Sequence, residues 1–257
     1  MIEEQALISG VKTNYKIKGQ GIPLLILHGW GGSSSSWIGV QDILCKKGFR
    51  IVSPDFPGFG QSAVPKTAWN LDDYVKWLSE FVKYMELEKF CLLGHSFGGR
   101  VAVKFAVANP EKIEKLILCD AAGIKISPSL KTVTLKLAAE MGNFVLDRRY
   151  LRIVRDFLRN ILYFFIKQKD YVKAEGLMRE TMKLILEENL LPLLPKISSK
   201  TLIIWGQDDK LVLVGVSYKF RDNIRGSVLE IFPNVGHSPH MEIPDKLSES
   251  VFNFVKQ

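Results

Sequence analysis

A serine stands between glycines in the stretch CLLGHSFGGR, residues 91–100, with Gly94 two places before Ser96 and Gly98 two places after it. The apolar run 90–93 precedes this motif and small residues follow it, so a strand, a sharp turn and a helix are expected. We expect a turn so tight that a Cβ at either glycine would collide with it. The pattern therefore predicts a nucleophilic serine on a strand-to-helix turn rather than a structural glycine-rich loop.

A serine hydroxyl needs a base to take its proton near neutral pH, and the chain has four histidines. His237 lies in a loop of glycine and proline after the last expected strand, where an imidazole could reach across the strand ends. His240 is the nearby competitor, but there the loop is turning into the final helix. His95 adjoins the serine and should point away from it, as a buried, hydrogen-bonded side chain. We predict His237 as the base.

An acid must hold that imidazole in the correct orientation. Asp208 and Asp209 both follow the apolar run TLIIWG, residues 201–206. One of the two could be an ordinary turn residue, and we predict Asp209 as the acid. Asp120 is a second candidate, because it also ends an apolar run that should lie close to the serine. The predicted order along the chain is serine, aspartate, histidine.

Acyl transfer also needs hydrogen-bond donors for the oxyanion. The glycine-rich turn that follows the expected strand 24–27 contains His28 and Gly29 as supporting residues, and we predict the backbone N–H groups of Trp30 and Phe97 as the two donors. The turn lacks the lysine and hydroxyl residue of a phosphate-binding loop, and no G-x-G-x-x-G pattern opens a helix there. A nucleotide cofactor is therefore not expected.

Short apolar runs alternate with longer amphipathic stretches up to residue 123 and again from 201 onward. This alternation predicts an α/β fold of parallel strands joined by crossover helices. Asn70 is expected to cap a helix that begins at Leu71, and Pro110 should end the helix that follows the serine.

The alternation stops between Gly123 and Pro195, where consecutive helices without strands are expected. Segments rich in proline and serine mark both ends. We therefore predict a core of residues 1–123 and 196–257, and a helical cap inserted over residues 124–195.

The composition is that of an ordinary globular protein, with 257 residues, 47% hydrophobic and 24% charged. The N-terminus has no secretory signal pattern and no apolar run is long enough to span a bilayer, so we expect a cytoplasmic protein without stable membrane insertion. The three cysteines show no disulfide framework, and no metal-ligand spacing is present.

The net charge of +8 is concentrated in one segment, because residues 124–200 hold 15 Lys and Arg against 8 Asp and Glu. Four arginines of this segment fall on one face of an expected helix: Arg148, Arg152, Arg155 and Arg159. We interpret this face as solvated rather than as a membrane surface or a site for acidic substrates, and no nucleic-acid partner is expected. Five apolar residues are interpreted as cap core that partly lines an acyl pocket: Tyr163, Phe164, Phe165, Met178 and Met182.

Five motifs in order along the chain resemble those of the α/β-hydrolase-fold serine hydrolases: HGWGG, DFPGFGQS, GHSFGG, WGQDD and GHSPHMEIPD. The resemblance implies a mostly parallel eight-stranded sheet whose second strand is antiparallel, a helical cap after the sixth strand, and no cofactor. Haloalkane dehalogenases and epoxide hydrolases of this family carry aspartate at the nucleophile position. The serine in this chain favours acyl transfer.

We therefore expect a serine hydrolase that cleaves carboxylic esters of small to medium apolar acyl groups through an acyl-enzyme intermediate. Two alternatives stay open. The first keeps the triad but cleaves carbon–carbon bonds, as meta-cleavage-product hydrolases do. The second is a ligand receptor that reuses the fold and has weak turnover. The sequence leaves the oligomeric state undetermined.

Overall fold

The computed structural model describes residues 1–125 and 172–257 of the chain. The predicted arginine face, residues 148–159, and the aromatic cluster, residues 163–165, lie outside the described residues. The described part of the predicted insertion contains the helix α6 (Val172–Glu187) and the short 3-10 helix η3 (Leu191–Lys196). No helix within the described ranges is both long enough and apolar enough to cross a membrane.

The described strands form one eight-stranded sheet with the spatial order β1-β2-β4-β3-β5-β6-β7-β8. The strands are, in chain order, β1 (Ile2–Ile8), β2 (Val11–Lys18), β3 (Ile22–Leu27), β4 (Phe49–Pro54), β5 (Phe90–His95), β6 (Ile113–Cys119), β7 (Lys200–Gly206) and β8 (Val228–Phe232). Strand β2 is antiparallel to both of its neighbours, and the pairs from β4 to β8 are parallel. This arrangement confirms the expected mostly parallel sheet with an antiparallel second strand.

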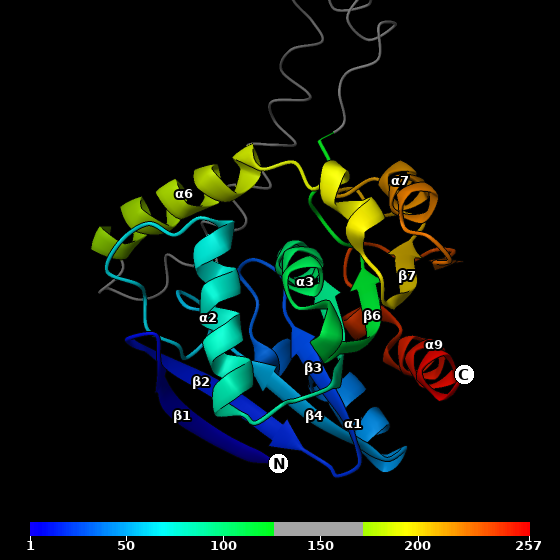
Figure 1. The fold of residues 1–257 in the computed structure, drawn as a ribbon, viewed down its shortest axis with the longest axis horizontal. Coiled ribbons are helices and arrows are strands. Elements are labelled where there is room, and N and C mark those ends of the chain that lie inside the picture. Colours follow the sequence, from blue (N-terminus) through cyan, green and yellow to red (C-terminus); the bar gives the residue numbers. More distant parts are fainter. Residues whose placement is uncertain (126–171) are drawn as a thin grey trace, which may run out of the picture.

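Helices cover both faces of the sheet, as Figure 1 shows. The other α-helices of the described residues are α1 (Ile38–Lys46), α2 (Leu71–Tyr84), α3 (Phe97–Ala108), α7 (Gly215–Asn223), α8 (Pro239–Glu242) and α9 (Pro244–Lys256). Buried side chains of α2, α3 and α7 form one apolar core, and those of α1 and α9 form a second core on the opposite face. Strands β3, β5, β6 and β7 contribute to both cores, which explains why they read as nearly continuous apolar runs.

Two helix boundaries predicted from the sequence are present. The side chain of Asn70 accepts a hydrogen bond from the backbone N–H of Asp73, and the Asp73 carboxylate accepts one from the N–H of Asn70, which forms a capping box at the start of α2. Helix α3 ends at Ala108, two residues before Pro110.

Helix α6 crosses the end of the molecule above α2 (Figure 1) and is held to the core by polar contacts. The guanidinium of Arg100 in α3 donates to the carbonyl oxygens of Ile185 (2.9 Å) and Glu188 (3.1 Å) at the end of α6. The backbone N–H of Trp69 donates to Thr181 Oγ1 at 3.0 Å. Met178 is buried in the first core, so α6 covers part of the edge where the parallel strands end.

Candidate active site

Ser96 occupies a strained backbone position between β5 and α3, with φ 51° and ψ −111°. Such a conformation costs about 1–3 kcal/mol in a residue with a side chain. Four backbone hydrogen bonds stabilise it: the Ser96 N–H donates to the carbonyl of Cys119 (3.1 Å), and the Ser96 carbonyl accepts from the N–H groups of Gly99 (3.0 Å), Arg100 (3.3 Å) and Ala122 (3.1 Å). The turn is therefore tied to the end of β6 as well as to α3.

The two glycines of the motif are required by close contacts. A Cβ at Gly94 would lie 2.5 Å from the carbonyl oxygen of Gly98, on the first turn of α3, as the prediction of a tight turn requires. A Cβ at Gly98 would lie 2.3 Å from the carbonyl oxygen of Leu27, at the end of the neighbouring strand β3. The expectation for Gly98 is therefore corrected, because the obstacle is an adjacent strand and not the turn itself.

Replacing Gly98 by alanine is expected to lower the free energy of unfolding by about 3 kcal/mol, because two backbone segments must separate to admit the methyl group. The matched control is Gly176→Ala in α6, where a Cβ would meet no atom within 4 Å and a gain of about 0.5–1 kcal/mol is expected. Urea denaturation followed by circular dichroism measures both changes. Equal stability of the two variants would contradict the steric argument.

The structure brings Ser96, His237 and Asp209 into one hydrogen-bonded line. His237 Nε2 lies 2.9 Å from Ser96 Oγ, and His237 Nδ1 lies 2.7 Å from Asp209 Oδ2. The three residues follow β5, β8 and β7 respectively, and the carboxyl ends of parallel strands meet at one edge of a sheet. The imidazole thus lies between a hydroxyl group and a carboxylate, the order that activation of a serine nucleophile requires.

The carboxylate of Asp209 is fully buried and held by the backbone that follows it. Its Oδ1 atom accepts hydrogen bonds from the N–H groups of Leu211 (2.7 Å) and Val212 (3.0 Å), which leaves Oδ2 for His237. Asp208 is exposed. The choice of Asp209 over its neighbour thus follows from a turn that points one carboxylate inward.

His95 and His240, the two histidines near His237 that are not predicted as the base, are buried and neutral. His95 Nε2 lies 2.7 Å from the carbonyl oxygen of His237, and burial holds the pKa of His95 well below its ordinary value. The ring of His240 stacks on Trp37, with 4.3 Å between centroids, and burial lowers the pKa of His240 to about 3. His95 therefore positions the backbone of the histidine loop, a role that the sequence did not reveal.

The predicted oxyanion turn packs directly against the serine, since a Cβ at Gly29 would lie 3.3 Å from Ser96 Cβ. His28 is buried, and its Nε2 accepts the backbone N–H of Phe56 at 2.9 Å, so the ring proton is on Nδ1. That proton is donated to the Gly29 carbonyl at 2.7 Å, which also accepts the N–H of Gly32 at 3.0 Å. Burial lowers the pKa of His28, which keeps this neutral form.

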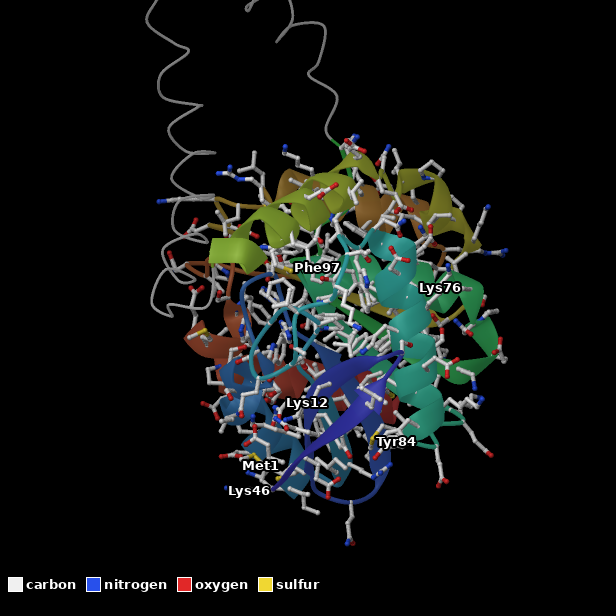
Figure 2. The ribbon with its side chains drawn as sticks, turned by 90° about the vertical axis from the view of Figure 1, so that its left-hand side faces the viewer. Met1, Lys12, Lys46, Lys76, Tyr84 and Phe97 are labelled. Carbon is white, nitrogen blue, oxygen red and sulfur yellow. The ribbon has the colours of Figure 1, made fainter. Side chains whose placement is uncertain are left out.

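These contacts orient the backbone N–H group of the next residue, Trp30. In a trans peptide the C=O and the next N–H point in opposite directions, so fixing the Gly29 carbonyl fixes the N–H of Trp30. Among the described residues, no protein acceptor is bonded to the backbone N–H of Trp30 or Phe97. The rings of these two residues meet edge to face with centroids 5.3 Å apart. Figure 2 shows Phe97 on the side of the molecule that α6 covers, far from Met1 and Lys46.

Asp55 links two loops near the serine, and the sequence alone did not indicate this. It is buried at the end of the apolar strand β4, and its carboxylate accepts hydrogen bonds from the backbone N–H of Ser34 (2.6 Å) and Gln61 (2.9 Å) and from Asn14 Nδ2 (3.0 Å). It thereby joins the segment after the oxyanion turn to the DFPGFGQS turn. The sequence feature that could have identified Asp55 is the position of an aspartate directly after an apolar strand.

Asp120, the second candidate acid, is buried beside Asp209 but does not occupy its place. Asp120 Oδ1 accepts the backbone N–H of Gly206 at 2.9 Å. Both ring nitrogens of His237 bond to other residues, Ser96 and Asp209. Asp120 therefore lies next to the serine–histidine–aspartate line without being hydrogen-bonded to His237.

Comparisons with known proteins agree with this fold. The sequence profile of the α/β hydrolase fold family matches residues 22–169. The chain is 28% identical over 269 residues to 2-hydroxy-6-oxo-6-(2'-aminophenyl)hexa-2,4-dienoic acid hydrolase of Metapseudomonas resinovorans, covering 100% of this chain and 91% of that protein.

Two solved structures are also similar. A serine hydrolase involved in carbazole degradation has 28% sequence identity and a TM-score of 0.78, covering 99% of this chain and 98% of that one. An esterase from Exiguobacterium antarcticum has 21% identity and a TM-score of 0.78 over 100% of both chains, a likeness of fold. The family profile covers more than half of the chain, and the chain therefore belongs to the α/β hydrolase fold family, as a hydrolase.

Proposed function

We propose that this protein is a serine hydrolase that cleaves carboxylic esters of small to medium apolar acyl groups. The observation that carries the proposal is the continuous line from Asp209 through His237 to Ser96, with heavy-atom distances of 2.7 and 2.9 Å. These distances lie within the range in which a general base accepts a proton from a hydroxyl group.

The reaction proceeds in two steps. Ser96 Oγ bonds to the ester carbonyl carbon while its proton passes to His237 Nε2, and the oxyanion accepts hydrogen bonds from the N–H groups of Trp30 and Phe97. The carbon–oxygen bond then breaks, and the leaving alcohol takes the proton from His237. A water molecule attacks the acyl-enzyme with His237 again as base, releasing the carboxylic acid and restoring the serine.

The residues around the nucleophile support an apolar acyl group. Trp30 and Phe97 meet edge to face beside Ser96, and Trp30 also meets Phe59 edge to face, at 4.7 Å between centroids. Met178 of α6 is buried close to Gly58 on the same side of the sheet. We propose that residues 124–195 form a cap that closes this apolar site and excludes water from it.

A second candidate is the hydrolysis of a carbon–carbon bond, which the relative from Metapseudomonas resinovorans favours. The dienoic acid in that protein's name carries a ketone and no ester, so its hydrolysis must break a bond between carbons. The same serine, base and oxyanion donors would serve this reaction, because it also passes through an addition to a carbonyl carbon.

A fluorophosphonate probe and two substrate series test the proposal. We expect the probe to label the native protein at Ser96, located by mass spectrometry of the labelled peptide, and heat-denatured protein to remain unlabelled. We expect short-chain p-nitrophenyl esters to be turned over faster than a vinylogous 1,5-diketone. Faster turnover of the diketone would select the carbon–carbon reaction, and absence of labelling would favour a ligand receptor over an enzyme.

A further inference from the structure

Two carboxyl groups are buried side by side in this site, although the proposed reaction uses only one. Asp120 follows β6 and is fully buried, and Asp209 follows the neighbouring strand β7 and is 3% exposed. One carboxylate oxygen of each and one ring nitrogen of His237 all lie within 4.8 Å of one another. Two negative charges this close cannot both be retained away from water, so one of the carboxyl groups must hold a proton.

The hydrogen-bond donors identify which carboxyl group is ionised. Asp209 accepts three hydrogen bonds, from the N–H groups of Leu211 and Val212 and from His237 Nδ1, which is the environment of a carboxylate anion. Asp120 accepts one strong bond, from Gly206 N–H, and a weak contact from Cys119 Sγ at 3.5 Å. The proton therefore resides on Asp120.

Electrostatics agrees with this assignment. Burial and, to a smaller extent, the charge of Asp209 raise the pKa of Asp120 to about 8, against the opposing effect of the Gly206 hydrogen bond. The titratable groups that face Asp120 are Cys119 on its own strand, Asp209 after β7 and His237 after β8. Among the described residues, no lysine or arginine contributes to the pKa shift of Asp120.

We propose that Asp120 is a positioning residue of the proposed hydrolase site, a neutral carboxylic acid that donates its proton in a hydrogen bond to the Asp209 carboxylate. This inference rests on the proposed function for its effect on turnover. The shared proton holds the Asp209 side chain in place and makes it a weaker proton acceptor, so the imidazolium proton stays on His237 during the reaction.

The backbone around Asp120 is built to hold this geometry. Asp120 has φ 44°, an unfavourable value for a residue with a side chain, and its N–H donates to the carbonyl of Ile204 at 2.9 Å. The Asp120 carboxyl group in turn accepts the N–H of Gly206, which lies on β7 like Ile204. The residue therefore bridges the ends of β6 and β7 and aims its carboxyl group toward the acid of the proposed triad.

Replacing Asp120 by asparagine tests the protonation state through activity. The amide keeps one donor and one acceptor and is neutral, so kcat at pH 7 should stay within about threefold of the wild type. Asp120→Leu removes the donor and should lower kcat by about tenfold. Asp209→Asn is the matched control for a carboxyl group that must be ionised. A loss in Asp120→Asn as large as in Asp209→Asn would overturn the proposal.

The pH dependence separates this role from a purely structural one. Ionisation of Asp120 removes the hydrogen bond that it donates to Asp209 and places two negative charges side by side, so the Asp209 carboxylate is no longer held in position against His237. We expect kcat/KM of the wild type to fall above about pH 8, following the pKa of Asp120, and the Asp120→Asn variant to lack this fall. The same alkaline fall in both proteins would count against the proposal.

Infrared difference spectroscopy provides a readout that does not require turnover. The C=O stretch of a protonated carboxyl group should be present near neutral pH in the wild type and in the Ser96→Ala variant, and should be absent in Asp120→Asn. If the proposed function fails, the band still reports whether Asp120 holds the proton. A band that persists in Asp120→Asn would reject the assignment whatever the enzyme does.

Discussion

The Asp209→Asn variant is expected to lose about 10⁴-fold in kcat while remaining folded. The reason lies in how the carboxylate is held. Its Oδ1 position accepts two backbone N–H groups, so an asparagine must place its carbonyl oxygen there and its NH2 group at the position facing His237. An amide donor at that position requires an unprotonated Nδ1, which puts the ring proton on Nε2. The ring then cannot accept the proton of Ser96.

Steady-state kinetics on a p-nitrophenyl ester, with Ser96→Ala as the reference for complete loss, measures this effect. Asp208→Asn is the matched control, because that carboxylate is adjacent in sequence but exposed, and its rate should match the wild type. Nitrogen-15 chemical shifts of the His237 ring report the change of tautomer directly. Retention of more than a tenth of the wild-type kcat in Asp209→Asn would show that another group orients the imidazole.

Acidification is expected to destabilise the fold steeply below pH 6.5. His95 and His240 are buried neutral, with the pKa of His95 held well below 6.5 and that of His240 lowered to about 3, so the unfolded chain binds protons that the native state excludes. Each such histidine lowers the free energy of unfolding by about 1.4 kcal/mol per pH unit as the pH falls below 6.5. His28, whose pKa burial also lowers, acts in the same direction.

Asp120 opposes this trend. The pKa of Asp120 is raised in the native state, so between 3.8, its ordinary value, and the raised value the native state holds a proton that the unfolded chain has lost. The contribution of Asp120 to the free energy of unfolding therefore becomes more favourable as the pH falls toward 3.8. Two buried histidines set against Asp120 leave a net loss in the free energy of unfolding of about 1.4 kcal/mol per pH unit near pH 5.

Urea denaturation at a series of pH values measures the slope. The His240→Gln variant, which removes one ionisable ring, should reduce the loss by about 1.4 kcal/mol per pH unit. The exposed Asp208→Asn variant provides the control for a change that leaves the buried histidines intact. If the His240→Gln slope equals that of the wild type, the ring at position 240 is not the buried neutral group that the structure describes.

Several features could be predicted from the sequence because their causes act over a few residues. The strand, turn and helix around Ser96 follow from the glycine spacing and the apolar run before it, and the capping box at Asn70 follows from short-range hydrogen bonding. The alternation of apolar runs and amphipathic stretches predicted the parallel strands. The antiparallel second strand was expected only from the family resemblance, and β1 was not predicted from its own residues, since most of it is exposed and its pattern shows no buried face.

The sequence alone thus determined the choice of Ser96, Asp209 and His237 and their order, because each lies in a short recognisable pattern: a glycine-flanked turn, the end of an apolar run, and a loop with glycine and proline. Tertiary structure decided which neighbours surround them. The obstacle that requires Gly98 comes from β3, and His95 holds the carbonyl of His237 from a distant part of the chain. Protonation states depend on burial and on charges brought together by strand order, and these are set only when the whole sheet has formed.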